Sequence, residues 1–309
     1  MRALTKVFLS IFLSLVFYGA TFTFLVKKPL TIGFIHDAFQ VKAAYANKIR
    51  GPKVIIVAGS NGLFSFRCEV MEPILKRPCL NASVTVILGL KLTLKKAQEF
   101  LKAGDVILMP FEYNYYYRNF LPASGYNYLL SYEPEKWLSL PLAEKIPAIF
   151  SFDFHYLISG IVETLLRTMG IQRKFHAAML TQQGDMSGHT ALKARQFQKS
   201  IGEPLIPTPE EIDRKHAYKD YVINFFKWAA KNKIRIFGIL PTTIDTKTVS
   251  AQTEKKIAQL YTRNGQSFIF QPNRGQYSRE CFFDTHYHLH EACQIKHSIS
   301  VANFLKQRL

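Results

Sequence analysis

Residues 282–298 read FFDTHYHLHEACQIKHS, and within them one aspartate precedes three histidines at every second position. Three chemistries would suit Asp284, His286, His288 and His290. An aspartate beside a histidine can orient the imidazole as a general base for a nucleophile elsewhere in the chain. Alternating histidines on a strand would instead share one face and, with the aspartate, could bind zinc. The third interpretation is a polar start of a helix without a chemical role.

A candidate nucleophile lies near the start of the chain. Residues 53–59, KVIIVAG, form a β-branched apolar run that ends on glycine and predicts a buried strand, and Ser60 follows it directly. In parallel α/β sheets ligands bind where the strands end, so a hydroxyl at this point can face a cleft with the next helix behind it. The alternative is a turn in which Ser60 or Asn61 caps that helix.

The elements that must position these residues alternate along the chain. We predict strands at residues 53–59, 83–88, 105–112, 234–241 and 267–272, and helices at 92–104, 220–233 and 254–265, with Gly104 as the stop of the first helix. This alternation predicts an α/β fold with a mostly parallel sheet covered on both faces. Residues 114–215, rich in Tyr and Pro, interrupt the pattern and are expected to form an insertion.

The N-terminus predicts a membrane anchor. Residues 7–26 carry no charge over about 20 positions, which is the length a helix needs to cross a hydrocarbon core. A cleaved signal peptide is the competing interpretation, but the nearest small-x-small site, Ala44-Tyr45-Ala46, lies far beyond the apolar run. We therefore expect an anchor at residues 1–30 and a domain at 31–309 on one side of the membrane.

Composition and cysteine usage agree with an exported domain. The chain has 309 residues, 48% of them hydrophobic, and a net charge of +18, so it can bury a core and attract phospholipid, acidic glycans or nucleic acid. Export argues against nucleic acid. Cys68 and Cys79 are eleven residues apart and Cys281 and Cys293 twelve, which allows two local disulfides or four thiols. Without a CxxC pair, a zinc ribbon is not expected.

Three blocks together resemble the SGNH (GDSL-like) hydrolase and acyltransferase superfamily. They are VIIVAGSNGLFSF, KAGDVILMPFEYNYY and FFDTHYHLHEACQIKHS, some 45 residues in all. With the N-terminal anchor, they look like the membrane-anchored bacterial branch linked to O-acylation of cell-surface polymers, which includes the D-alanyl transfer proteins of teichoic acid. The resemblance implies a three-layer α/β domain in which a serine after the first strand meets an aspartate and a histidine from the C-terminal segment.

The resemblance also implies roles for single residues. Ser60 would be the nucleophile, Asp284 the acid and His288 the base, because the family's histidine is commonly followed by leucine. An Asp-x-His spacing, found in related enzymes, would select His286 instead. In the zinc interpretation, His155, His176, His189 and Asp153 of the insertion are further candidate ligands.

The oxyanion hole departs from the family's pattern. The family uses a backbone amide after the serine, a glycine near the place of Ser83, and an asparagine where this chain has Glu112. A carboxylate cannot stabilise an oxyanion unless it is protonated. Either Asn114 or Asn61 substitutes for the missing asparagine, or Glu112 has another role, such as an ion pair.

The expected activity is acyl transfer, with acetyl the expected group, to hydroxyls of a cell-surface polysaccharide through an acyl-serine intermediate. The basic charge would suit an acidic polymer, no cofactor or metal is needed, and a multi-span membrane acyltransferase would deliver the group. The expected location is the cytoplasmic membrane, with the domain on the periplasmic, extracytoplasmic side. The alternatives are a carbohydrate esterase with the same triad and an inactive glycan-binding or scaffold subunit.

Overall fold

The computed structural model describes residues 2–116, 122–214 and 217–309. The chain divides into two compact units. Unit 1 comprises Met1–Asp37 and Leu121–His176, and unit 2 comprises Ala38–Phe120 and Ala177–Leu309. Residues 121–176 of the expected insertion are therefore grouped with the N-terminal helix, whereas residues 114–120 and 177–215 belong to the unit that contains the sheet.

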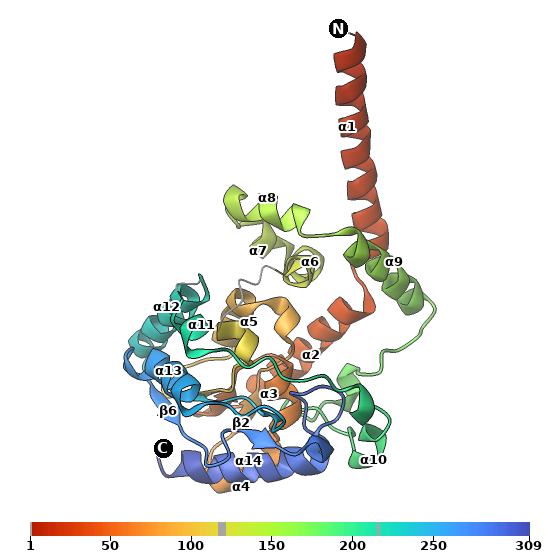
Figure 1. Ribbon diagram of the computed structural model, residues 1–309. Coiled ribbons are helices and arrows are strands. Elements are labelled where there is room, and N and C mark those ends of the chain that lie inside the picture. The colour runs from red at the N-terminus through yellow and green to blue at the C-terminus, as the bar shows by residue number, and fades with distance from the viewer. Residues whose placement is uncertain (1, 117–121, 215–216) are drawn as a thin grey trace. The chain divides into compact units, whose positions relative to one another are not determined.

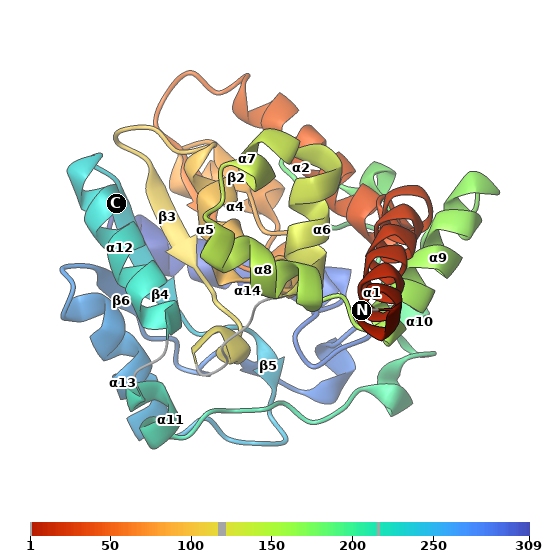
Figure 2. The same cartoon turned by 90° about the horizontal axis from the view of Figure 1, so that it is seen from above.

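Unit 2 is built on a five-stranded parallel sheet with the strand order β2-β1-β3-β4-β6 (Figure 2). The strands are β1 (Val54–Ile56), β2 (Cys79–Asn81), β3 (Val106–Met109), β4 (Arg235–Ile239) and β6 (Ser267–Ile269). The predicted α/β fold with a mostly parallel sheet is confirmed, whereas the closer likeness to the SGNH arrangement stays a prediction.

Helices cover both faces of this sheet. On one face, α3 (Ser60–Ser65) and α4 (Cys68–Leu75) lie with α14 (Glu291–Lys306), which packs along α4 over a core that includes Val54, Leu108 and Val301 (Figure 1). On the other face, α12 (Ala217–Lys231) and α13 (Ala251–Thr262) contact β4. Gly238 of β4 leaves room for the ring of Tyr261, because a Cβ there would lie 2.6 Å from it.

Two predicted elements differ from the structure. Residues Val86–Leu88 form a 3₁₀-helix, η2, rather than a strand, because the Thr85 side chain caps it and β1 pairs with Cys79–Asn81 instead. Helix α5 (Leu90–Gln98) ends before Gly104. Gly104, at φ +88°, instead turns the chain into β3, and its N–H donates to the Lys233 carbonyl at 3.0 Å.

The remaining elements of unit 2 are short. They are η3 (Tyr113–Tyr116), η4 (Ala177–Met179), α10 (Ala191–Ala194), η5 (Gln198–Ser200), α11 (Pro209–Asp213), η6 (Arg279–Cys281), and the parallel pair β5 (Thr243–Ile244) and β7 (Gln276–Tyr277).

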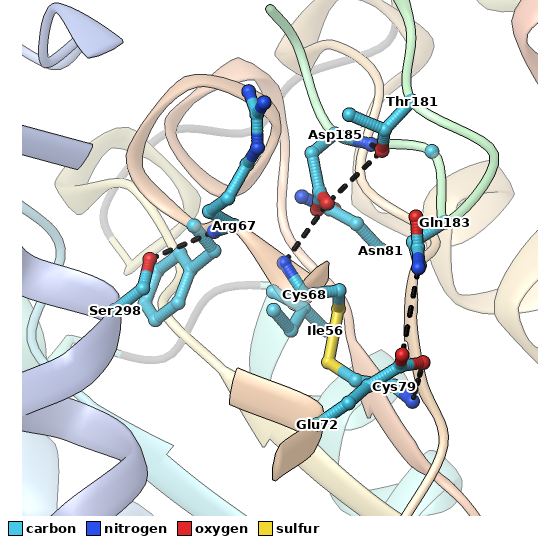
Figure 3. Close-up of a disulfide and its surroundings, with 12 residues drawn as sticks. Ile56, Arg67, Cys68, Glu72, Cys79, Asn81, Thr181, Gln183, Asp185 and Ser298 are labelled. Atoms are coloured by element: carbon cyan, nitrogen blue, oxygen red, sulfur yellow. Dashed lines mark hydrogen bonds between the residues drawn. A yellow bond between two sulfur atoms is a disulfide. The ribbon is translucent and has the colours of Figure 1, made fainter. Parts of the chain in front are cut away.

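Both local cysteine pairs form disulfides, Cys68–Cys79 and Cys281–Cys293. Figure 3 shows the first, which joins α4 to β2. The N–H of Cys68 donates to Asp185 at 2.9 Å, and the N–H of Cys79 donates to Glu72 at 2.9 Å. This end of the sheet is thus fixed by a disulfide and by two carboxylates that accept hydrogen bonds from backbone N–H groups.

Unit 1 is helical in its described part. It contains α1 (Arg2–Thr21), the π-helix η1 (Phe22–Val26), the start of α2 (Leu30–Ala46), α6 (Ala123–Tyr132), α7 (Pro134–Leu138), α8 (Leu142–Phe150) and α9 (Phe154–Thr168). Residues Ala3–Val26 form a 24-residue helical stretch that is long and apolar enough to cross a membrane. A membrane anchor and a signal sequence share these properties.

Candidate active site

Ser60 lies at the first position of α3, four residues beyond the end of β1, and is half-buried. The turn that carries it needs glycine before it. A Cβ at Gly59 would lie 2.8 Å from the Val86 backbone nitrogen and 2.6 Å from a carboxylate oxygen of Glu112. The predicted strand-Gly-Ser arrangement is therefore a close-packed strand-to-helix turn at the carboxyl end of a central strand.

Asp284 and His288 contact each other, with 2.8 Å between Asp284 Oδ1 and His288 Nδ1. Their segment is a closed loop rather than a strand or a helix. The N–H of Phe283 donates to the His288 carbonyl at 2.7 Å, and that of His290 donates to the Cys281 carbonyl at 2.8 Å. A carboxylate at Nδ1 favours the tautomer whose other nitrogen, Nε2, can accept a proton.

Two contacts join the start of α3 to this loop. Phe64, one helical turn after Ser60, stacks on the His288 ring with the centroids 4.1 Å apart and the planes 9° from parallel. The Asn61 side-chain amide donates to the Tyr287 carbonyl at 2.9 Å. The structure thus brings together the segments that carry Ser60, Asp284 and His288, from positions more than 220 residues apart in the sequence.

The other histidines of the segment lie elsewhere. His286 packs against Tyr287, and burial, followed by the neighbouring His288, lowers its pKa. His290 caps the start of α14, where its side chain accepts the N–H of Cys293. His297 is fully buried and contacts the Tyr277 hydroxyl at 2.8 Å. His290 and His297 therefore have structural roles, and neither is a surface residue.

The zinc interpretation needs His286, His288 and His290 together on a strand, and the loop does not supply one. Among the described residues, the group of potential ligands that lie within 4.8 Å of one another is Cys281, His290 and Cys293. Its two sulfurs are joined in a disulfide.

Glu112, where the resemblance predicts an asparagine, lies against the turn that carries Ser60. Its carboxylate accepts the N–H of Asn61 at 2.7 Å and that of Gly59 at 3.0 Å. The side chain is buried, and burial raises the pKa of Glu112 to about 7, against the lowering effect of the N–H groups it accepts. Glu112 makes no ion pair within the part of the chain that the structure describes.

Two of the other candidate oxyanion donors, Ser83 and Asn61, are also occupied by internal bonds. The N–H of Ser83 donates to the Asn81 side chain at 3.1 Å. The Asn61 side-chain amide donates hydrogen bonds to Thr242 Oγ1 at 2.6 Å and to the Tyr287 carbonyl at 2.9 Å. Asn114 is half-buried, and its Oδ1 has no hydrogen-bond partner among the described residues. Of the predicted donors, Ser83 and Asn61 therefore stabilise the fold around the serine instead.

Tyr113, Tyr115 and Tyr116 are buried, so their rings belong to the core and do not face a ligand. Tyr117 lies outside the described residues.

The sequence did not single out Phe64 or Thr242. Thr242 is buried just beyond β4, and its hydroxyl contacts Ser65 Oγ at 2.6 Å and the Tyr287 carbonyl at 3.0 Å. The sequence signal that could have identified Thr242 was its position directly after a predicted strand, in the run ILPTT. The pairing of Phe64 with His288 had none, because it depends on a contact between distant segments.

Comparison with family models, with curated proteins and with solved structures finds no match for this chain. We therefore infer the function from the geometry of the residues.

Proposed function

We propose that this chain is a membrane-tethered acyl-transfer enzyme of the SGNH type, with Ser60 as nucleophile, His288 as base and Asp284 as the residue that orients it. The observation that carries the proposal is the Asp284–His288 pair, 2.8 Å apart, against the helix whose first residue is Ser60. A three-layer arrangement of the superfamily, rather than only an α/β fold, belongs to the same proposal.

The chemistry follows from these groups. His288 Nε2 takes the Ser60 proton as the serine oxygen attacks the acyl carbonyl, and the leaving group departs with that proton. The hydroxyl of a polysaccharide then attacks the acyl-serine while His288 accepts its proton, which releases the acylated polymer and restores the serine. Water as the acceptor gives an esterase. No cofactor takes part in either reaction.

The setting of this reaction is part of the proposal. α1 anchors the chain in the cytoplasmic membrane with unit 2 on the periplasmic, extracytoplasmic side, where disulfides persist. Because one helix cannot carry an activated acyl group across a bilayer, a multi-span membrane acyltransferase delivers it. The net charge of +18 suits an acidic polysaccharide.

Labelling with a fluorophosphonate tests the proposal. We expect Ser60→Ala to abolish the adduct, and His288→Gln to slow its formation by about a hundredfold or more, the usual effect of losing a general base. His286→Gln is the matched control, because the same substitution at the neighbouring histidine leaves Asp284–His288 intact. A rate that falls with His286→Gln and not with His288→Gln would transfer the role of base to His286.

One observation favours a second function, a non-catalytic glycan-binding or scaffold subunit. Glu112 accepts the Asn61 N–H, which is the amide expected to stabilise an oxyanion. If the wild-type chain forms no Ser60-dependent adduct and does not hydrolyse an acetyl-ester chromogen, the scaffold function replaces the enzymatic one.

A further inference from the structure

Large apolar side chains are exposed on α9 in a single stripe. They recur at spacings of four, four, three and four residues and are between 45% and 78% exposed: Phe154, Ile158, Val162, Leu165 and Met169. At 3.6 residues per turn, these positions span less than a quarter of the helix circumference. A single exposed apolar residue needs no explanation, but a continuous stripe marks a surface that contacts something apolar.

Helix α8, just before α9 in the sequence, carries a second stripe. Leu142, Ile146 and Phe150 follow one another at four-residue spacing and are between 55% and 79% exposed. Within the described residues, ten exposed large apolar side chains lie between residues 138 and 171, whereas the larger unit 2 has four. The exposed apolar surface outside α1 and η1 is therefore concentrated in this part of unit 1.

Unit 1 holds α9 against the end of the apolar helix. Gly160 packs on Val26, since a Cβ there would lie 2.6 Å from Val26 Cγ1, and Phe152 contacts Phe22 with the ring centroids 4.8 Å apart. Glu163 accepts the N–H of Thr31 at 2.7 Å. Figure 1 shows α8 and α9 at the level of the lower, C-terminal end of α1. The stripe lies on the side of α9 opposite Gly160, so it faces away from this contact.

The end of the apolar helix also exposes large apolar side chains. Phe24 and Leu25, directly before Val26, are themselves exposed. Between residues 121 and 176 five acidic residues balance five basic ones, so attraction to anionic headgroups does not account for the arrangement. Insertion of apolar side chains beside α1 does account for it.

We propose that α8 and α9 lie in the interfacial layer of the membrane that α1 crosses, with their apolar stripes among the lipid acyl chains. This inference depends on α1 being an anchor, which belongs to the proposed function, but it does not depend on the triad. It gives residues 138–171 a role as a second, in-plane attachment that fixes unit 1 at the bilayer surface.

The test uses the full chain in phosphatidylcholine nanodiscs with one nitroxide-labelled cysteine at a time. The four native cysteines are in disulfides and do not react with the label. Ile158→Cys and Ile146→Cys report on the stripes, and Ser159→Cys, exposed on α9 but outside the stripe, is the matched control. Phe12→Cys on α1 reports on the anchor separately. Collision with oxygen, which partitions into lipid, is compared with collision with a water-soluble nickel chelate.

We expect the ratio of oxygen collisions to nickel collisions to be severalfold higher for labels at positions 158, 146 and 12 than for the label at position 159. If the labels at positions 158 and 146 collide mainly with nickel while the label at position 12 collides mainly with oxygen, the in-plane attachment is refuted and the anchor stands. If 12 also favours nickel, the anchor fails and the inference fails with it. Labels at 158 and 146 that are shielded from both reagents would show that a protein surface covers the stripes, which also overturns the proposal.

Discussion

At the scale of single residues, Glu112 is where this chain departs furthest from the chemistry that its sequence suggests. A buried carboxyl group normally has to be satisfied by donors, and here the donors are the N–H groups on either side of Ser60. The same side chain therefore fixes the turn that carries Ser60 and occupies the Asn61 N–H, which is one expected oxyanion donor. For a substrate oxyanion to use the Asn61 N–H, Glu112 has to move or give up that bond.

Glu112 makes stability depend on pH in a defined direction. Its pKa rises from 4.5 to about 7 on folding, so the folded state binds a proton that the unfolded state has lost between these values. The contribution of Glu112 to stability is then greatest below pH 4.5, falls by about 3 kcal/mol as the pH rises to 7, and is constant above. Urea unfolding of the full chain in detergent at pH 5 and pH 8 measures most of this difference.

Glu112→Gln is the matched control for that measurement, because glutamine has nearly the same shape and does not titrate. We expect the variant to lose most of the fall in stability between pH 5 and pH 8 that the wild type shows. An equal fall in both proteins would assign the pH dependence to other groups.

Among the elements, α3 is positioned by two glycines that allow close packing. Gly59 lies against Glu112, and Gly62 lies against Ser83. A Cβ at Gly62 would lie 2.7 Å from Ser83 Cβ and 3.0 Å from Ala58 Cβ. The helix that begins with Ser60 is thus packed directly on the segment after β2, which places the serine at the carboxyl end of β1.

We expect Gly62→Ala to destabilise unit 2 by about 1–3 kcal/mol through overpacking, even though alanine is the better helix former by about 1 kcal/mol. Ser83→Gly removes the atoms that the new methyl group would meet. The double variant should therefore recover a large part of the loss, and a double-mutant cycle from urea unfolding measures the coupling. Strictly additive effects would contradict this packing.

At the scale of the whole molecule, buried polar groups join segments that are distant in the sequence. Lys42 of α2 is fully buried, and its Nζ donates to the carbonyls of Asn81 at 2.7 Å and Gly184 at 2.6 Å. Burial lowers the pKa of Lys42 and raises that of the neighbouring Asp185, while the attraction between the two charges opposes both shifts. Asp185 in turn accepts the Cys68 N–H beside the first disulfide (Figure 3).

Lys42→Met should cost about 3–5 kcal/mol of unfolding free energy, since it leaves two buried carbonyls unpaired and the Asp185 carboxyl without its cationic neighbour. Lys48→Met, an exposed lysine near the end of the same helix region, is the matched control and should change stability by less than about 0.5 kcal/mol. Equal effects of the two substitutions on the urea midpoint would contradict the buried role of Lys42.

The sequence by itself determined the α/β class, the apolar N-terminal helix and the residues worth testing as a triad. These features depend on local periodicity and on short motifs, such as the β-branched run before Gly59 and the Asp284–His288 spacing. The extent of η2 and the early end of α5 were not predictable, because capping by Thr85 and the pairing of β1 with β2 override local propensity.

Only the tertiary structure decided what surrounds Ser60. The stacking of Phe64 on His288, the Thr242 hydroxyl at the Tyr287 carbonyl, and the Glu112 carboxylate on the Asn61 N–H each join residues at least 45 positions apart. Contacts of this kind follow from which strands become neighbours in the sheet, and that order leaves no periodic trace in the sequence. The exposure of the stripes on α8 and α9 was decided in the same way, by which helix faces unit 1 buries and which it leaves outside.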